Sequence, residues 1–124
     1  MGVIQLYDLR ISDMMKMQQE LWEINKDKWT AIEPQYGRNY LLWMVEEMGE
    51  AISIIKKKGD NAIMANENVR AAFLEELSDI LMYYIEVLRR YNITSCEISQ
   101  AFICKHNQNM KRNYCSEYSD MYEK

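Results

Sequence analysis

The sequence predicts an all-α fold, a four-helix bundle that forms a single domain over residues 1–124. The chain has one proline and four glycines against ten methionines, so helix breakers are few and flexible helix formers are many. Apolar residues recur every three to four positions in four long segments, and no segment alternates as a strand would. A chain of 124 residues suffices for one hydrophobic core but not for two.

The first expected helix begins at Ser12 or Asp13, either of which can cap it, and ends at about Trp29. Its apolar side chains share one face, at Met14, Met17, Leu21 and Ile24. Pro34 and Gly37 then interrupt the periodicity, so the residues around them are expected to connect two helices.

The second expected helix runs from about Arg38 to Lys58. Its apolar residues again follow helical spacing, at Leu41, Val45, Met48, Ile52 and Ile55. Three lysines, residues 56–58, precede Gly59, where cations favour the negative end of the helix dipole. The segment GDNAIMAN, residues 59–66, is expected to be a polar connection.

Two further helices are expected in the second half of the chain. Asn66 can cap the third, which ends at about Tyr91. Thr94 followed by Glu97 has the form of a capping box, which predicts a fourth helix that ends at about Arg112. The tail, residues 113–124, shows no clear period and predicts no element.

Composition excludes several classes of function. A net charge of -4 argues against non-specific binding to nucleic acid or to an anionic membrane, because no basic field dominates the molecule. No apolar run approaches the roughly 18 residues of a membrane span, and the N-terminus lacks the pattern of a signal peptide. The cysteines are odd in number and form no CxxC pair, which favours a reducing cytoplasm over a disulfide framework or a zinc knuckle; they are Cys96, Cys104 and Cys115.

Two acidic clusters raise the question of a site, EEMGE at residues 46–50 and EELSD at residues 75–79. At about 100° per residue, Glu47 and Glu50 fall in one sector of the second helix, among Trp43, Ala51 and Ile54. Glu46 falls on the opposite flank, with Gly49, Ser53 and Lys57. Two of these three glutamates are therefore expected among apolar groups and one in water.

The third helix repeats this arrangement. Glu76 and Asp79 share a sector with Val69, Ile80, Tyr83 and Val87. Glu75 is expected to face solvent together with Ser78, Met82, Glu86 and Arg89. Four carboxylates in apolar-flanked sectors would repel one another, and a divalent cation resolves that conflict. Because the ligands are oxygens without a histidine, Mg²⁺ is expected first and Mn²⁺ next.

The fourth helix adds positive charge, because the face that bears Ile98, Ala101 and Phe102 continues into Lys105, Asn109 and Arg112. Cations near a metal and carboxylates suit the binding of a polyphosphate. The competing explanation is structural, since the helix dipole alone favours cations near a C-terminus.

The chain carries three motifs in order, EExxE at 46–50, ExxD at 76–79 and KxxxNxxR at 105–112. This ordered set resembles the motifs of the all-α nucleoside triphosphate pyrophosphohydrolases, the MazG-like and dimeric dUTPase superfamily. The resemblance covers about residues 12–112. It implies metal ligands with a catalytic role at Glu47, Glu50, Glu76 and Asp79, and phosphate contacts at Lys105, Asn109 and Arg112. It also implies a homodimer or homotetramer that uses Mg²⁺ to hydrolyse a nucleoside triphosphate to the monophosphate and pyrophosphate, in house-cleaning of the nucleotide pool.

Several alternatives stay open at the level of sequence. Trp43 is expected in the core or a pocket wall, whereas Trp29, Tyr36 and Tyr83 can stack on a base or simply pack; Trp43 and Tyr83 are taken as substrate-binding. A di-iron bundle needs Glu-x-x-His, and Ile103 stands three residues before the lone His106, which is expected at the surface. The non-enzymatic alternative is a helical interaction module that binds metal without turnover. The base and sugar of the substrate are not predicted.

Overall fold

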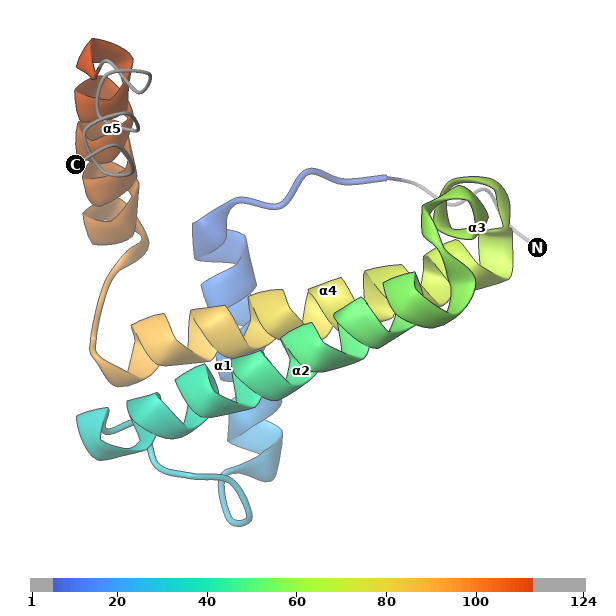
Figure 1. The fold of residues 1–124 in the computed structure, drawn as a ribbon. Helices are drawn as coiled ribbons and strands as arrows, with labels where there is room; N and C mark the ends of the chain where they lie inside the picture. The colour runs from blue at the N-terminus through green and yellow to red at the C-terminus, as the bar shows by residue number, and fades with distance from the viewer. Residues whose placement is uncertain (1–5, 113–124) are drawn as a thin grey trace, which may run out of the picture. The chain divides into compact units, whose positions relative to one another are not determined.

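The computed structural model describes residues 6–112, and in that range it contains helices and no strand, which confirms the all-α class (Figure 1). The helices are α1 (Ile11–Asn25), the 3₁₀ turn η1 (Pro34–Tyr36), α2 (Gly37–Lys58), α3 (Asp60–Ala65), α4 (Glu67–Arg90) and α5 (Ser95–Lys111). Residues 6–94 belong to one compact unit, and α5 belongs to a second unit that is described by itself. None of the helices in residues 6–112 combines the length and the apolar character that a membrane span requires.

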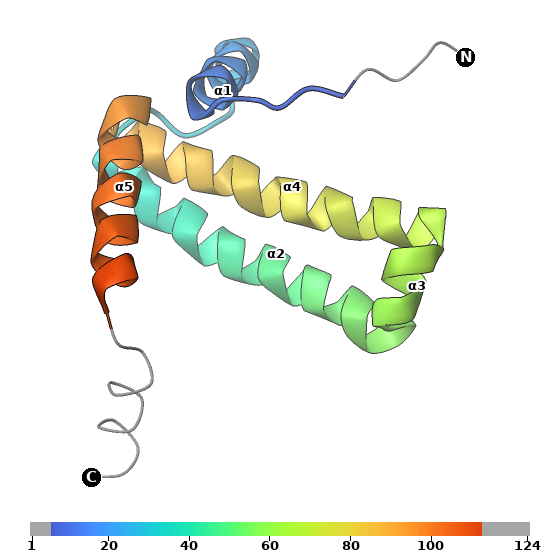
Figure 2. The same cartoon turned by 90° about the horizontal axis from the view of Figure 1, so that it is seen from above.

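The centre of the first unit is an antiparallel pair, because α3 turns the chain between α2 and α4 and the two long helices lie side by side (Figures 1 and 2). Tyr40 and Met44 of α2 pack against Val87 of α4, with Ile80 and Tyr83 partly buried around them. Burial of these side chains fixes which faces of the two helices meet.

Helix α1 crosses α4 and contacts its C-terminal half (Figure 2). This contact buries Glu86 to 3% exposure and leaves the side chain of Arg89 only 7% exposed. The expectation that both residues face water with Glu75 is therefore wrong. Helix periodicity assigns one environment to each side of a helix along its whole length. Helix α1 covers only part of α4, so residues on the same side of α4 differ in burial.

The helix boundaries agree with local sequence signals where the cap was identified correctly. Asn66 caps α4 as predicted, since its Oδ1 accepts hydrogen bonds from the backbone N–H groups of Asn68 and Val69 at 3.0 and 3.1 Å. Helix α2 stops at Gly59, whose φ of 83° favours glycine. Helix α5 begins directly after Thr94, where the capping box was expected.

Two expected boundaries are wrong. Helix α1 begins at Ile11 after the N-cap residue Arg10, and Asp13 contributes inside the first turn by accepting the Arg10 N–H at 2.9 Å. It also ends at Asn25, so Trp29 lies in the connection to η1. The segment expected to be a polar connection contains the short helix α3, which buries Ile63. Burial of this one apolar side chain is enough to pack α3 against the neighbouring helices.

Candidate active site

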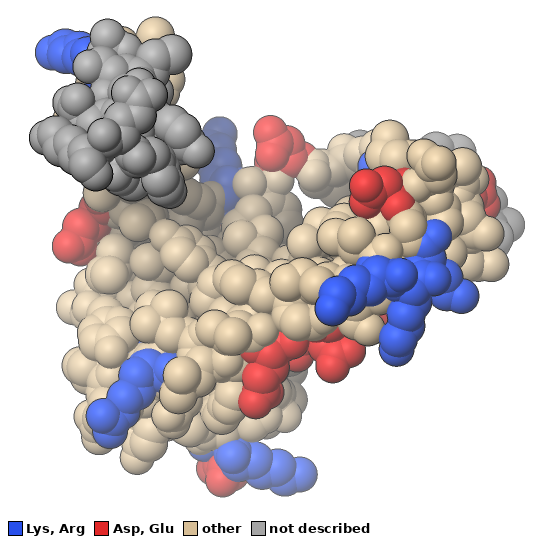
Figure 3. Space-filling model, in the orientation of Figure 1, with Lys and Arg blue, Asp and Glu red and all other residues tan. Residues whose placement is uncertain are grey.

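Three carboxylates meet where α2 and α4 run side by side. Glu47 of α2 and Glu76 and Asp79 of α4 each offer one oxygen, and these oxygens all lie within 4.8 Å of one another. All three residues are half-buried. Figure 3 shows acidic side chains gathered along α2, and its final turn carries the lysines at residues 56–58. We call Glu47, Glu76 and Asp79 the acidic cluster.

The acidic cluster holds a proton near neutral pH. A hydrogen bond with Glu76, partial loss of water and the nearby negative charges together raise the pKa of Glu47 from 4.5 to about 7. Burial and the charges of Glu47 and Asp79 also raise the pKa of Tyr83, so its hydroxyl stays protonated beside the cluster. Such a set of oxygen donors with competing charges fits a hard divalent cation, which would replace the shared proton.

The other acids of the two motifs stand in water. Glu46 and Glu75 are exposed, as expected from their sectors. Glu50 is exposed as well, so the expectation that apolar groups surround it is wrong, although its charge contributes to the raised pKa of Glu47. The i, i+3 spacing places Glu50 beside Glu47 on α2, but the neighbouring helix covers only the earlier of the two.

An aromatic cavity of about 440 Å³ adjoins the acidic cluster and includes Asp79 in its wall. Its aromatic lining residues are Trp29, Tyr40, Trp43 and Tyr83. The ring centroids of Tyr40 and Trp43 lie 4.9 Å apart in an edge-to-face contact, and those of Trp43 and Tyr83 lie 6.2 Å apart. Trp43 and Tyr83 thus line the cavity, as the prediction of a substrate pocket requires, and Trp29 joins them. This volume suits a small organic ligand.

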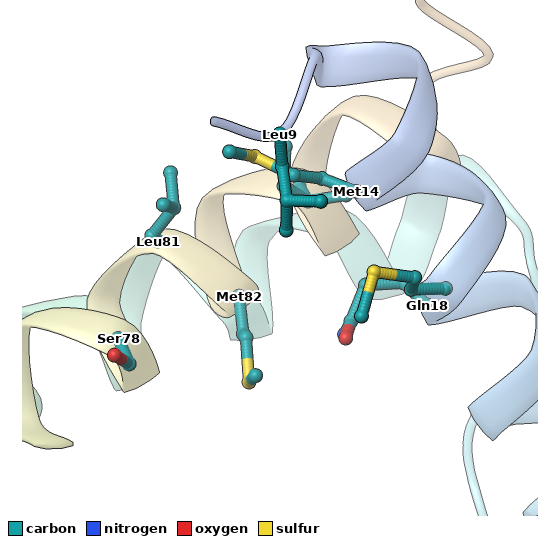
Figure 4. Close-up of a pocket in the computed structure, with 8 residues that line it drawn as sticks. Leu9, Met14, Gln18, Ser78, Leu81 and Met82 are labelled. Carbon is teal, nitrogen blue, oxygen red and sulfur yellow. The ribbon is translucent and has the colours of Figure 1, made fainter. Parts of the chain in front are cut away.

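A second hollow, a groove of about 180 Å³, lies between α1 and α4 (Figure 4). Its walls are mainly apolar and include Leu9, Met14, Leu81 and Met82, with Gln18 at the border it shares with the aromatic cavity. It contains no acidic residue. The chemistry of the chain therefore concentrates at the cluster and the aromatic cavity.

A buried polar network, absent from the sequence prediction, supports the aromatic cavity. Glu86 accepts hydrogen bonds from Nη1 of Arg89 at 2.8 and 2.6 Å and from Nη1 of Arg90 at 2.9 Å. Arg90 is 1% exposed, lies 4.0 Å from the ring centroid of Tyr40, and donates to Oγ1 of Thr30 at 3.0 Å. The network therefore ties the connection after α1 to both long helices.

Part of this network carries a local signal in the sequence. Glu86 precedes Arg89 and Arg90 by three and four residues, a spacing at which opposite charges meet on a helix. The spacing predicts a pair but not its burial. Gln18 and Thr30 have no such signal, because each reaches its partner from a distant part of the chain.

The predicted phosphate-contacting residues all belong to α5. Lys105 and Asn109 line a small hollow of that helix with Phe102 and His106, and Oδ1 of Asn109 has no hydrogen-bond partner among the residues described. Arg112 is exposed just after the helix. Their spacing puts them on one side of α5, and their role toward phosphate stays a prediction.

The chain is similar to the dCTP pyrophosphatase 1 of Bos taurus, with 38% identity over 80 residues. The match covers 60% of this chain and 44% of that protein, so the two share less than half the length of the relative. No protein-family model and no solved structure matches the chain. The similarity relates this chain to a nucleoside triphosphate pyrophosphatase.

Proposed function

We propose that this chain hydrolyses a nucleoside triphosphate between the α and β phosphorus atoms, giving the monophosphate and pyrophosphate. The observation that carries the proposal is the convergence of three carboxylate oxygens within 4.8 Å beside a cavity walled by aromatic rings. The sequence similarity to a dCTP pyrophosphatase supports the same reaction class. Removal of miscoding or surplus nucleotides from the cytoplasmic pool is the role that this chemistry would serve.

Glu47, Glu76 and Asp79 would hold Mg²⁺, or Mn²⁺ in its place, with Glu50 completing the set from the exposed side. Such an ion, when bound, lowers the pKa of water and neutralises phosphate charge. In the metal-free cluster Glu47 shares a proton with Glu76, and a bound cation would take the place of that proton.

The aromatic cavity would hold the base of the nucleotide. Every base has a π-face, so stacking on an aromatic ring gives affinity with little dependence on sequence or base type. Trp43 and Tyr83 line the cavity near Asp79, and Trp29 is 39% exposed in the same wall. Lys105, Asn109 and Arg112 are proposed to contact the phosphates, which their KxxxNxxR spacing supports.

We further propose that the active form is a homodimer or a homotetramer. Large apolar side chains remain in water on α2, where Leu42 and Val45 are 64% exposed and Ile52 is 52% exposed. An exposed apolar surface of this kind usually marks an interaction site. Light scattering at several protein concentrations measures the association directly, and a mass of one chain throughout would contradict it.

The decisive experiment is release of pyrophosphate from a panel of nucleoside triphosphates, beginning with dCTP, in Mg²⁺ or Mn²⁺. Glu76→Gln and Asp79→Asn each remove a ligand charge from the acidic cluster and should lower the rate about a hundredfold or more. Glu75→Gln is the matched control, because this neighbouring glutamate is exposed. A wild-type protein without activity on any triphosphate would favour the metal-binding interaction module instead.

A further inference from the structure

Two residues of the connection between α1 and η1 form part of the wall of the aromatic cavity. Trp29, which is 39% exposed, and Thr30 both line it. Residues 26–33 contain no helix or strand, and the Trp29 N–H bonds back to the carbonyl oxygen of Asn25 at 2.9 Å. Side-chain contacts must therefore hold this part of the wall against the long helices.

Thr30 is hydrogen-bonded to three helices. Its carbonyl oxygen accepts from Nε1 of Trp22 on α1 at 2.9 Å and from Nη2 of Arg90 on α4 at 3.2 Å. Its Oγ1 accepts from Nε and Nη2 of Arg90 at 3.2 and 3.0 Å and lies 3.2 Å from the hydroxyl oxygen of Tyr40 on α2. Three helices thus fix one residue of the connection, and Trp29 is the residue next to it.

Arg90 also reaches the other aromatic rings of the cavity. Its guanidinium carbon lies 4.0 Å from the ring centroid of Tyr40, a cation–π contact in which Arg90 is 1% and Tyr40 7% exposed. The ring of Tyr40 meets those of Trp43 and Tyr83 edge to face, with centroids 4.9 and 5.8 Å apart. Thr30 and Tyr40 line the cavity and Arg90 binds both, so Arg90 acts on the ligand-facing wall through them.

The guanidinium of Arg90 has its orientation fixed from two sides. Nη1 donates to Oε2 and to the carbonyl oxygen of Glu86, at 2.9 and 3.4 Å. The edge formed by Nε and Nη2 is then left for Thr30, and the flat face for Tyr40. A planar group with several donors makes these contacts together, and an ammonium group cannot replace it.

We propose that Arg90 is a positioning residue, which holds the aromatic cavity in its ligand-binding form through Thr30 and Tyr40. A cavity whose rings are already in place loses less conformational freedom when a base stacks in it, so its affinity for the ligand is higher. The inference rests on the proposed function, because it takes the cavity to hold the base of a nucleotide. Since the acidic cluster consists of other side chains, Arg90 contributes to nucleotide binding and not to the cleavage step.

Thr30 offers the sharpest test, because Thr30→Val keeps the side-chain volume and the backbone carbonyl but removes the hydroxyl that Arg90 and Tyr40 contact. Isothermal titration of the full chain with dAMP, dCMP, dGMP and dTMP measures nucleotide binding without turnover. For the nucleotide that the wild type binds most tightly, Thr30→Val should raise Kd about tenfold, since the Arg90 N–H groups lose an acceptor and the wall is no longer held. Thr30→Ser keeps the hydroxyl and should have a Kd within about twofold of the wild-type value.

Fluorine NMR of the protein labelled with 5-fluorotryptophan reports the position of this wall without any ligand. The chain has three tryptophans, and Trp29→Phe identifies the Trp29 resonance. In Thr30→Val this resonance should move toward its position in the unfolded chain, whereas in Thr30→Ser it should stay in place. Arg90→Lys keeps the charge beside Glu86 but loses the planar fork, so it should reproduce the result of Thr30→Val.

Ile63→Val controls for a general loss of stability. Ile63 is 7% exposed in α3, which joins α2 and α4 at the ends opposite to Tyr40 and Arg90 (Figure 2). This variant should lower the free energy of unfolding but leave the Kd for the nucleotide and the Trp29 resonance unchanged. Equal effects of Thr30→Val and Ile63→Val on the Kd would show that Arg90 serves stability alone, and would overturn the inference.

Measuring kcat and KM for a nucleoside triphosphate that the wild type hydrolyses separates this inference from the proposed function. Thr30→Val should raise KM about tenfold and change kcat by less than about twofold. Hydrolysis with an unchanged KM in Thr30→Val would overturn the inference and leave the proposed function standing. Nucleotide binding that weakens in Thr30→Val and not in Thr30→Ser, without any hydrolysis, would support the inference and contradict the proposed function. A wild type that binds none of the four monophosphates, or equal Kd values in the wild type and Thr30→Val, refutes positioning by Arg90.

Discussion

Binding of a divalent cation to the acidic cluster should depend on pH in a way set by Glu47. The cation must displace the proton that Glu47 and Glu76 share, because a ligating carboxylate has to be ionised. With a pKa of about 7, Glu47 is half ionised at pH 7. About a tenth of it is ionised at pH 6, so the apparent Kd for Mn²⁺ should be about tenfold weaker at pH 6 than at pH 8.

Isothermal titration of Mn²⁺ from pH 5.5 to 8.5 measures this dependence, and buffers with different ionisation enthalpies report the proton that is released. In the wild type, log Kd should rise by about one for each unit by which the pH falls below 7, and it should be constant above 7. Glu76→Gln removes the hydrogen bond that contributes most to the raised pKa of Glu47. The pH at which log Kd becomes constant, which we call the break, should therefore move toward 4.5 in this variant, and the maximal affinity should also fall. The exposed Glu75 offers the control, since Glu75→Gln should leave the break near 7.

A Kd that stays constant between pH 6 and 8 would refute this account of the cluster. So would a break near 7 that persists in Glu76→Gln, because the raised pKa of Glu47 would then have another cause. Binding that is lost equally in Glu75→Gln would show that the general acidity of α4, and not the convergence of three oxygens, attracts the cation.

Two further predictions concern stability. Without metal, the free energy of unfolding should fall as the pH rises from about 4.5 to about 7 and then level off. The reason is that Glu47 loses its proton near pH 4.5 in the unfolded chain but keeps it until about pH 7 in the folded chain. Urea titration in the presence of a chelator measures this dependence, and Glu47→Gln should remove it. Arg90→Met should lower the free energy of unfolding by about 3 kcal/mol, since it withdraws one of the donors of the buried Glu86. Lys26→Met, at the exposed pair with Glu23, should cost less than about 1 kcal/mol, and equal losses in the two variants would contradict the importance of burial.

The fold class was predictable because its signals are local. Apolar spacing and the side-chain cap of Asn66 act within a few residues, and α2 and α4 lie within one or two residues of their expected ranges. The expected end of α1 at Trp29 is wrong because the apolar spacing stops at Ile24, and the chain turns after Asn25. Helix α3 was missed because its stability comes from burying Ile63 against its neighbours, and six residues seldom show a period of their own.

The acidic cluster was predictable for a related reason. Residues three apart share a side of any helix, so Glu76 and Asp79 were certain to point together once α4 formed, and the antiparallel partner then brings in Glu47. Gln18 was not predictable, because its contact with Glu86 joins residues 68 positions apart. No periodicity within one helix says where a second helix will cross it.

The same helix geometry places four polar or aromatic side chains of α4 on one side of the helix. Glu76, Asp79, Tyr83 and Glu86 are spaced by three, four and three residues, so at about 100° per residue they fall within a sector of about 80°. Along that stripe the chain places the acidic cluster, the aromatic wall and then the partner of Gln18. In the proposed function the phosphates would meet the acidic cluster and the base would meet the aromatic wall. One added residue between Asp79 and Tyr83 would turn the Tyr83 side chain about 100° away from the acids, and α4 would no longer present the aromatic wall beside the acidic cluster.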